Sequence, residues 1–427
     1  MASFFSSDEA LVGAAPVLHL ASGASNPSLV EGYIHPDFWS VARLFKSLIP
    51  SPAPGGAALC IYHRGRKVVD LWGGTVDSTG ARWNTDTASI SYSTTKGVAS
   101  TLLHILVDKG LLDYDEPVAR HWPEFAYGGK EKITVRQVMC HEAGLYDIGS
   151  MVDHARRMLD WEYMVRALEA AYPIHEPGKT HGYHGLTYGY LVGEIIQRVT
   201  GKKFAQVLEE EISKPLALDG LFIGLPAAEA HRKATLQLGG LQGHQGGAAR
   251  TRAYLAGINR WLQLVGVPVD LREAERALIP HGIDEVDFNS PEFAAACIPS
   301  ANGVFTARSL ATLYATLAGG GEMGGVRLIS EKTLHRASTV QNRTVDRVVP
   351  FPMQWRLGYH RPFTMGLGSG GIRHGIGHFG FGGSGAWADF DRNLAVALTL
   401  NSGVGTPFGD LRIVRIGTAA TRCADRR

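Results

Sequence analysis

The chain has 427 residues, of which 45% are hydrophobic and 19% charged, as is usual for a globular protein with a large core. Lys and Arg total 42 against 40 for Asp and Glu, which leaves a formal net charge of +2. A nucleic-acid-binding protein needs clustered positive charge, so this near-balance argues against a nucleic-acid partner.

The four cysteines are far apart, and none forms a C-x-x-C pair. This spacing excludes a zinc ribbon or a disulfide framework and favours reduced thiols. The first twenty residues contain Asp8 and Glu9 but no Lys or Arg, unlike a secretory signal. No uninterrupted apolar run approaches the roughly 18 residues of a membrane span. We therefore expect a cytoplasmic protein with no membrane partner.

Strand patterns open the interpretable part of the chain. Ala57–Tyr62 and Lys67–Trp72 are rich in β-forming residues and flank the turn His63-Arg64-Gly65-Arg66. A helix is predicted next, over Ser93–Gly110, because its apolar residues recur at helical spacing and its glycine is a typical C-terminal stop.

The middle of the chain, from about Asp115 to Pro299, is predicted to be mainly helical. Its clearest periodic segments are Trp161–Ala171 and Leu186–Thr200, the second of which is stopped by Gly201. Within it, Gly239–Ala249 is glycine-rich and is a candidate loop or lid over a site.

The end of the chain returns to strand character. Gly385–Phe390 and Leu394–Leu400 flank the turn Asp391-Arg392-Asn393 and predict an antiparallel hairpin. Phe408–Ala420 is a candidate closing helix. The early and late segments thus share a strand-plus-helix character, with a helical insertion between them.

The first chemical motif is Ser93-Thr94-Thr95-Lys96, at the start of the predicted helix. Residues i and i+3 share a helix face, so the Lys96 amine can approach Ser93 Oγ. Free N–H groups and the positive dipole end at a helix N-terminus favour a developing oxyanion. A lysine acts as a base only if burial or a neighbouring cation lowers its pKa. By itself, the tetrad also fits a capping serine and a solvated lysine.

Two further motifs strengthen the interpretation. Tyr183-His184-Gly185 lies in a loop before a predicted helix, where a tyrosine can relay protons. Gly377-His378-Phe379-Gly380-Phe381-Gly382-Gly383 enters the last hairpin, and glycines beside a strand allow a substrate to approach backbone N–H groups closely.

In this order, the three motifs resemble S-x-x-K, Y-x-N and K-T-G of the serine β-lactamase and penicillin-binding protein superfamily. The segment Ile133–Leu145 also resembles the family pattern I-T-V-R-x-L-L-x-H-x-S-G-L. The chain is most similar to the class C-like branch called family VIII carboxylesterases, over roughly Gly55 to Asn401. The resemblance implies an α/β domain with an antiparallel sheet (1–114 and 300–427), a mainly helical domain (115–299), and an active site in the cleft between them.

The resemblance also implies roles for individual residues. Ser93 would be the nucleophile, Lys96 its base or proton shuttle, and Tyr183 the group that assists deprotonation and protonates the leaving group. The oxyanion hole would be formed by the backbone N–H groups of Ser93 and Phe381. Neighbouring candidates are the substrate-binding His378, Phe379, Gly380 and Asn302 (in the turn Ser300-Ala301-Asn302-Gly303), a structural His141, and His181 and His184, which flank the tyrosine.

Two departures from the family pattern bear on the substrate. His378 stands where lactamases place the lysine that holds the drug carboxylate, and a histidine with a pKa of about 6.5 is mostly neutral at pH 7. Gly185 stands where an asparagine contacts the side-chain amide of the lactam. Both changes remove lactam recognition and favour small esters. Aromatic residues near the last hairpin are expected to line an apolar pocket or to pack in the core: Phe379, Phe381, Trp355, Tyr359 and Trp387.

Other functional classes fit less well. The chain has no G-x-S-x-G motif of an α/β-hydrolase and no H-E-x-x-H motif of a metalloprotease. Gly178-Lys179-Thr180 resembles the end of a nucleotide-binding Walker A motif, but Pro173 stands where that motif needs its first glycine. A binding-only homologue would not need Ser93, Lys96 and Tyr183 together. We expect no metal and no cofactor. A β-lactamase, a D-peptidase and an acyltransferase of the same superfamily remain open alternatives to the esterase.

Overall fold

The computed structural model describes residues 30–50, 53–238, 271–349, 352–365, 371–403 and 410–427. The candidate lid at Gly239–Ala249 lies outside these described residues. Within them, no helix has the length and apolar character needed to cross a membrane.

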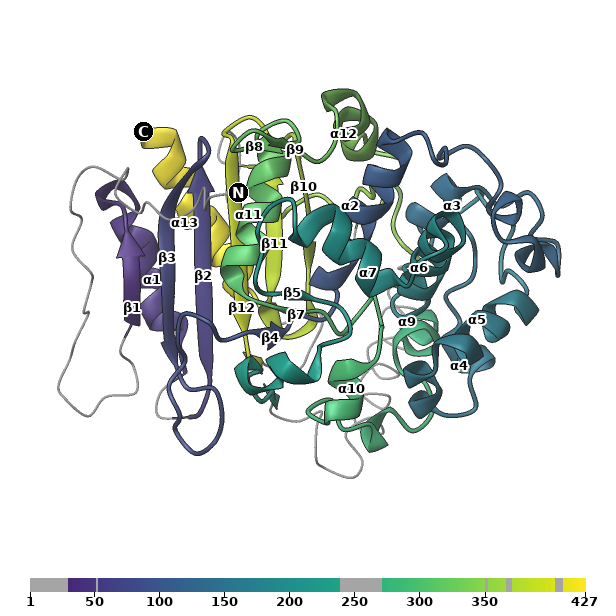
Figure 1. Cartoon of the computed structure of the whole chain (residues 1–427), viewed down its shortest axis with the longest axis horizontal. Coiled ribbons are helices and arrows are strands. Elements are labelled where there is room, and N and C mark those ends of the chain that lie inside the picture. Colours follow the sequence, from purple (N-terminus) through teal and green to yellow (C-terminus); the bar gives the residue numbers. More distant parts are fainter. Residues whose placement is uncertain (1–29, 51–52, 239–270, 350–351, 366–370, 404–409) are drawn as a thin grey trace, which may run out of the picture.

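A six-stranded sheet forms one part of the molecule, with the strand order β1-β3-β2-β12-β11-β10 and antiparallel pairing throughout. Both predicted hairpins are confirmed and lie within this sheet (Figure 1). In the first hairpin, the turn uses Arg64 and Gly65 at positive φ, as a tight turn requires. The strands are β1 Val30–Ile34, β2 Gly56–His63, β3 Arg66–Gly74, β10 Gly375–Phe379, β11 Gly385–Asp389 and β12 Leu394–Leu400.

Helices cover both faces of the sheet (Figure 1). Alternate residues of a strand point to opposite faces, so Leu59 and Ile61 pack in one core and Cys60 in the other. The helices α1 (Trp39–Leu48) and α13 (Arg412–Arg426) cover the first face, and α11 (Ala307–Ala318) packs on the second. The closing helix predicted at Phe408–Ala420 is therefore present, but begins at Arg412 and continues to Arg426.

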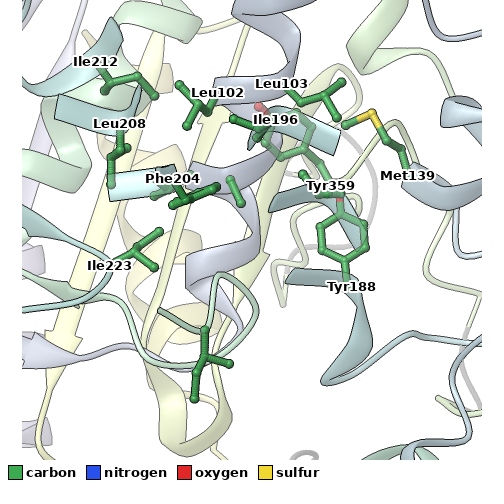
Figure 2. Close-up of a cluster of buried hydrophobic side chains, with 14 of the residues drawn as sticks. Leu102, Leu103, Met139, Tyr188, Ile196, Phe204, Leu208, Ile212, Ile223 and Tyr359 are labelled. Atoms are coloured by element: carbon green, nitrogen blue, oxygen red, sulfur yellow. The ribbon is translucent and has the colours of Figure 1, made fainter. Parts of the chain in front are cut away.

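The helix α2 (Thr94–Asp108) joins the sheet to the helical part of the chain. It contacts β10 on one side and α6 (Thr187–Thr200) on the other, and it is buried along nearly its whole length. Figure 2 shows Leu102 and Leu103 of α2 among the buried side chains of this core. The predicted helix at 186–200 is confirmed, and its stop at Gly201 has a φ of +68°. The other helices are α3 Val135–Met139, α4 Ile148–Met151, α5 Trp161–Ala170, α7 Phe204–Leu208, α9 Leu271–Leu278, α10 Pro291–Ala295 and α12 Glu331–Ser338.

The middle segment is not purely helical. It contributes β5 (Leu221–Phe222) to a small sheet with β4 (Ser89–Ile90) and β7 (Val304–Phe305). It also contributes β6 (Gln237–Leu238), which pairs with β13 (Ser402–Gly403). Residues 115–299 therefore return to the α/β part before they end, and no single boundary separates the two parts. A further short hairpin joins β8 (Glu322–Met323) and β9 (Val326–Arg327).

Candidate active site

Ser93 lies at the start of α2, immediately before its first residue. The serine is partly exposed, whereas the helix that follows it is buried. The preceding Tyr92 has a φ of +45°, an uncommon value for a residue with a side chain. This sharp turn into the helix places Ser93 at the N-terminal end, where the positive end of the helix dipole lies.

Lys96 is completely buried one turn along the same helix. Its Nζ lies 3.1 Å from Ser93 Oγ and donates to the carbonyl oxygens of Gly185 at 2.6 Å and Ser300 at 2.8 Å. Burial holds the pKa of Lys96 well below its ordinary value. The lysine thus links the start of its own helix to two distant parts of the chain, and its lowered pKa favours the neutral amine.

Tyr183 approaches Ser93 from the loop that precedes α6. Its hydroxyl donates to Ser93 Oγ at 2.7 Å, and Lys96 Nζ lies 4.8 Å from the centre of its ring. The ring stacks on Trp355, with centroids 5.3 Å apart and planes 9° from parallel. Burial raises the pKa of Tyr183, so the hydroxyl keeps its proton at neutral pH.

Asp346 supports the tyrosine and was not identified from the sequence. Its buried Oδ1 accepts hydrogen bonds from the backbone N–H of Tyr183 at 3.0 Å, Val348 at 2.8 Å and Val349 at 2.9 Å. Its Oδ2 accepts from Trp355 Nε1 at 2.8 Å. One carboxylate therefore holds both the backbone of Tyr183 and the ring on which it stacks. Burial raises the pKa of Asp346 to about 6.

Buried histidines shape the loop around Tyr183. His184 donates from Nδ1 to the Gly182 carbonyl at 2.8 Å, and its Nε2 accepts from Leu145 N at 3.0 Å. His141 Nδ1 accepts from His184 N at 3.1 Å. Burial lowers the pKa of His184 to about 3, so this histidine is neutral. These bonds agree with a structural role for His141 and extend that role to His184.

His181, on the other side of Tyr183, is also buried rather than exposed to solvent. Its Nε2 lies 3.9 Å from Asp346 Oδ2, and burial lowers its pKa to about 4. His181 is therefore neutral and gives the Asp346 carboxylate no positive charge to pair with.

The end of β10 closely approaches the backbone just before Ser93. A Cβ at Gly380 would lie 2.3 Å from Ser91 O and 2.3 Å from Ser384 Oγ, so only glycine permits this approach. The next residue, Phe381, places its ring 5.4 Å from that of Tyr92. Among the hydrogen bonds of the described residues, the backbone N–H groups of Ser93 and Phe381 have no acceptor.

The family model for beta-lactamase matches residues 41–421, nearly the whole chain. The chain belongs to the beta-lactamase family. It is 36% identical to the esterase/beta-lactamase LipL of Mycobacterium tuberculosis over 375 residues, which are 87% of this chain and 83% of LipL. It is also similar to a penicillin-binding protein homologue from Caulobacter crescentus (33% identity) and to a family VIII carboxylesterase (32%). Each of these two structures gives a TM-score of 0.78 and covers 92% of this chain and 99% of its own.

These similarities confirm the predicted fold and the resemblance to family VIII carboxylesterases, and they identify this beta-lactamase family member as a serine hydrolase. Its two departures from the family pattern lie beside the candidate catalytic groups. Gly185 has no side chain; its carbonyl accepts from Lys96 Nζ, and its N–H donates to Tyr183 O. His378 is buried, with its ring centre 6.1 Å from that of Tyr183.

The protonation of His378 follows from its surroundings. Its Nδ1 donates to the Phe379 carbonyl at 3.1 Å, and its buried Nε2 has no partner among the described residues. Burial lowers the pKa of His378 well below its ordinary value. The imidazole is thus neutral and presents an acceptor rather than a cation.

Three of the five aromatic candidates pack in or against the core of this beta-lactamase fold. Phe379 points to the opposite face of β10 from His378 and packs, partly buried, against the core that α1 and α13 cover. Trp387 lies in the same core, and the Tyr359 hydroxyl is bound to Thr101. Of the five aromatic candidates, Trp355 stacks on the candidate catalytic Tyr183, and Phe381 contacts Tyr92, which directly precedes Ser93.

Asn302 is buried, and the fold uses its side chain. Its Nδ2 donates to the carbonyls of Phe293 and Ala296, and its Oδ1 accepts from Ile298 N. These bonds favour a structural role over the expected substrate contact. The turn that contains Asn302 contributes to the site through Ser300 O, which accepts from Lys96.

Proposed function

We propose that this protein is a serine carboxylesterase that hydrolyses small esters through an acyl-enzyme on Ser93. One observation carries the proposal: Ser93 Oγ lies 3.1 Å from Lys96 Nζ and 2.7 Å from the Tyr183 hydroxyl. A weakly nucleophilic alcohol thus contacts both a buried amine and a protonated phenol, as a nucleophile and its proton-transfer partners must.

Acylation begins with neutral Lys96. A neutral amine has two N–H groups and one lone pair; the N–H groups donate to the Gly185 and Ser300 carbonyls, so the lone pair faces Ser93 Oγ. Lys96 takes the proton of Ser93 as Oγ attacks the ester carbonyl. The backbone N–H groups of Ser93 and Phe381, which have no other acceptor within the described chain, would stabilise the oxyanion.

Collapse of this intermediate breaks the bond to the alcohol oxygen. Tyr183 donates a proton to the departing alkoxide, and the proton held by Lys96 restores the phenol. Water then attacks the acyl-enzyme. Neutral Lys96 takes a proton from this water, with the Tyr183 hydroxyl as a relay, and returns it to Ser93 Oγ as the carboxylic acid leaves. The phenol suits the donor role because its raised pKa keeps it protonated.

Esters are favoured over lactams by charge and by space. His378 is neutral, so it supplies no fixed cation for a lactam carboxylate. Gly185 has no side chain with which to bind a lactam amide. The similar family VIII carboxylesterase and the esterase/beta-lactamase LipL agree with this preference, and the name of LipL keeps a second, β-lactamase activity as the alternative.

The nucleophile is tested by Ser93→Ala, with Ser47→Ala on the exposed surface of α1 as the control. The first variant should lose about 10³-fold or more of kcat/KM on p-nitrophenyl acetate and keep its fold by circular dichroism, while the control retains full activity. A serine-directed phosphonate should add its mass to the peptide that carries Ser93. Turnover by Ser93→Ala, or a label elsewhere, would overturn the assignment.

The reaction type is tested with a panel of short esters, long esters, a cephalosporin and a D-alanyl peptide. We expect a short ester to be hydrolysed fastest, because an alkoxide leaves more readily than an amide nitrogen. A higher kcat/KM on the cephalosporin would replace the esterase with a β-lactamase. Faster transfer to an added alcohol than to water would indicate an acyltransferase.

A further inference from the structure

The helix α9 lies against the residue that distinguishes this chain from lactam-binding relatives. A Cβ at Gly185 would lie 2.1 Å from Leu278 Cδ2 and 3.3 Å from Ala277 O. The side chain of Leu278 therefore fills the space into which the asparagine of the Y-x-N motif would extend. The missing amide is replaced by a packed hydrocarbon rather than by an open space.

Leu278 also lies close to the reacting groups. The carbonyl of Gly185 accepts the hydrogen bond of Lys96 Nζ at 2.6 Å, so the leucine contacts the residue that holds the base. Ala274 and Ala277 of α9 are buried in one cluster with Tyr183 and Trp355. Leu278 is only partly buried and packs against this cluster.

The helix is held firmly against the catalytic loop. Glu273 of α9 accepts from Arg347 Nε at 2.9 Å and from the Tyr146 hydroxyl. Arg347 directly follows Asp346, whose carboxylate binds the backbone N–H of Tyr183 at 3.0 Å. The wall formed by α9 is thus tied to the loop that positions the tyrosine, so a larger substrate cannot displace it freely.

We propose that Leu278 determines the size and polarity of the acyl pocket and restricts the enzyme to esters of short, apolar acids. Long acyl chains meet the leucine, and acyl groups with a side-chain amide find no polar partner there. This inference rests on the proposed esterase function, because it concerns which acyl group reaches Ser93.

The test measures kcat/KM on p-nitrophenyl esters from acetate to octanoate. Leu278→Ala should raise the ratio of octanoate to acetate activity by about tenfold or more, since each methylene in an apolar pocket is worth about tenfold or more. Leu278→Val removes less volume and should raise the ratio of octanoate to acetate activity by a smaller factor. It also provides a test if the alanine variant does not fold. Arg276→Ala, exposed on the same helix, is the control and should leave the profile unchanged.

A double-mutant cycle tests the contact itself. Gly185→Ala should lower kcat on acetate, because the new Cβ requires Leu278 to move and disturbs the carbonyl that binds Lys96. Leu278→Ala in that background should restore much of the loss. Chain-length profiles parallel to wild type in both Leu278 variants would overturn the inference while the esterase function stands. A wild-type protein that hydrolyses no ester would overturn both.

Discussion

Asp346→Asn tests whether a buried carboxylate positions the candidate catalytic tyrosine. An asparagine keeps one oxygen, which can still accept from the backbone N–H groups of Tyr183, Val348 and Val349. Its NH2 group would then face the Trp355 indole N–H, which now donates to Asp346 Oδ2 at 2.8 Å. The substitution therefore removes one hydrogen bond and one negative charge, with almost no change in size.

The lost hydrogen bond and the lost charge change the free energy of unfolding in opposite directions. An unpaired indole N–H costs about 1–3 kcal/mol. The folded protein raises the pKa of Asp346 from 3.8 to about 6, which costs wild type about 3 kcal/mol at pH 7 that the asparagine avoids. The free energy of unfolding should therefore stay within about 2 kcal/mol of wild type at pH 7. Activity should fall, by about tenfold in kcat, because Trp355 no longer holds the Tyr183 ring in place.

Urea unfolding at pH 7 and pH 4.5, together with kcat on p-nitrophenyl acetate, separates the effects. Because the folded pKa lies above the unfolded one, the contribution of Asp346 to stability is complete below about 3.8 and is lost as the pH rises through about 6. Between pH 7 and 4.5, wild type should gain about 2 kcal/mol relative to Asp346→Asn. The exposed Asp86→Asn is the control. Unchanged kcat in Asp346→Asn would refute the positioning role.

Three further predictions concern the groups that contact Ser93. Because burial lowers the pKa of Lys96, kcat/KM should rise with pH through that lowered pKa. Lys96→Arg stays charged, so its kcat/KM should be lower than that of wild type by about 10³-fold or more at every pH. An active arginine variant would contradict the role of Lys96 as the base. His378→Lys should lower the KM for a cephalosporin about tenfold or more, because the new cation can form a charge-assisted hydrogen bond with the carboxylate of the drug. The neutral variant His378→Gln should leave this KM unchanged. An equal change of KM in both variants would exclude the effect of charge. Gly380→Ala should reduce kcat about 10²–10³-fold, because its Cβ would push Phe381 N away from the oxyanion. Gly149→Ala is the control and should leave kcat unchanged, because the atom nearest to its new Cβ lies 3.6 Å away. Equal kcat values for the two variants would argue against this oxyanion hole.

Patterns among neighbouring residues were enough to predict the hairpins, the helix after Ser93 and the three motifs. These features depend on neighbouring residues: alternation along a strand, helical spacing, and a serine three positions before a lysine. Local signals do not say on which side of the backbone a side chain finds its partners. Phe379 and Asn302 lie beside motif residues in sequence, yet Phe379 packs against the core and Asn302 binds backbone groups.

Contacts between distant segments set how the candidate site is supported and which groups surround it. Asp346 lies 163 residues from Tyr183 in sequence, and no pattern in either segment predicts their hydrogen bond. Leu278 likewise reaches Gly185 from a helix formed much later in the chain. Such contacts arise because folding brings distant segments together in the core around Lys96, where burial also lowers the lysine pKa. Local patterns thus point to the candidate reacting groups, and long-range packing sets their protonation, their orientation and the space around them.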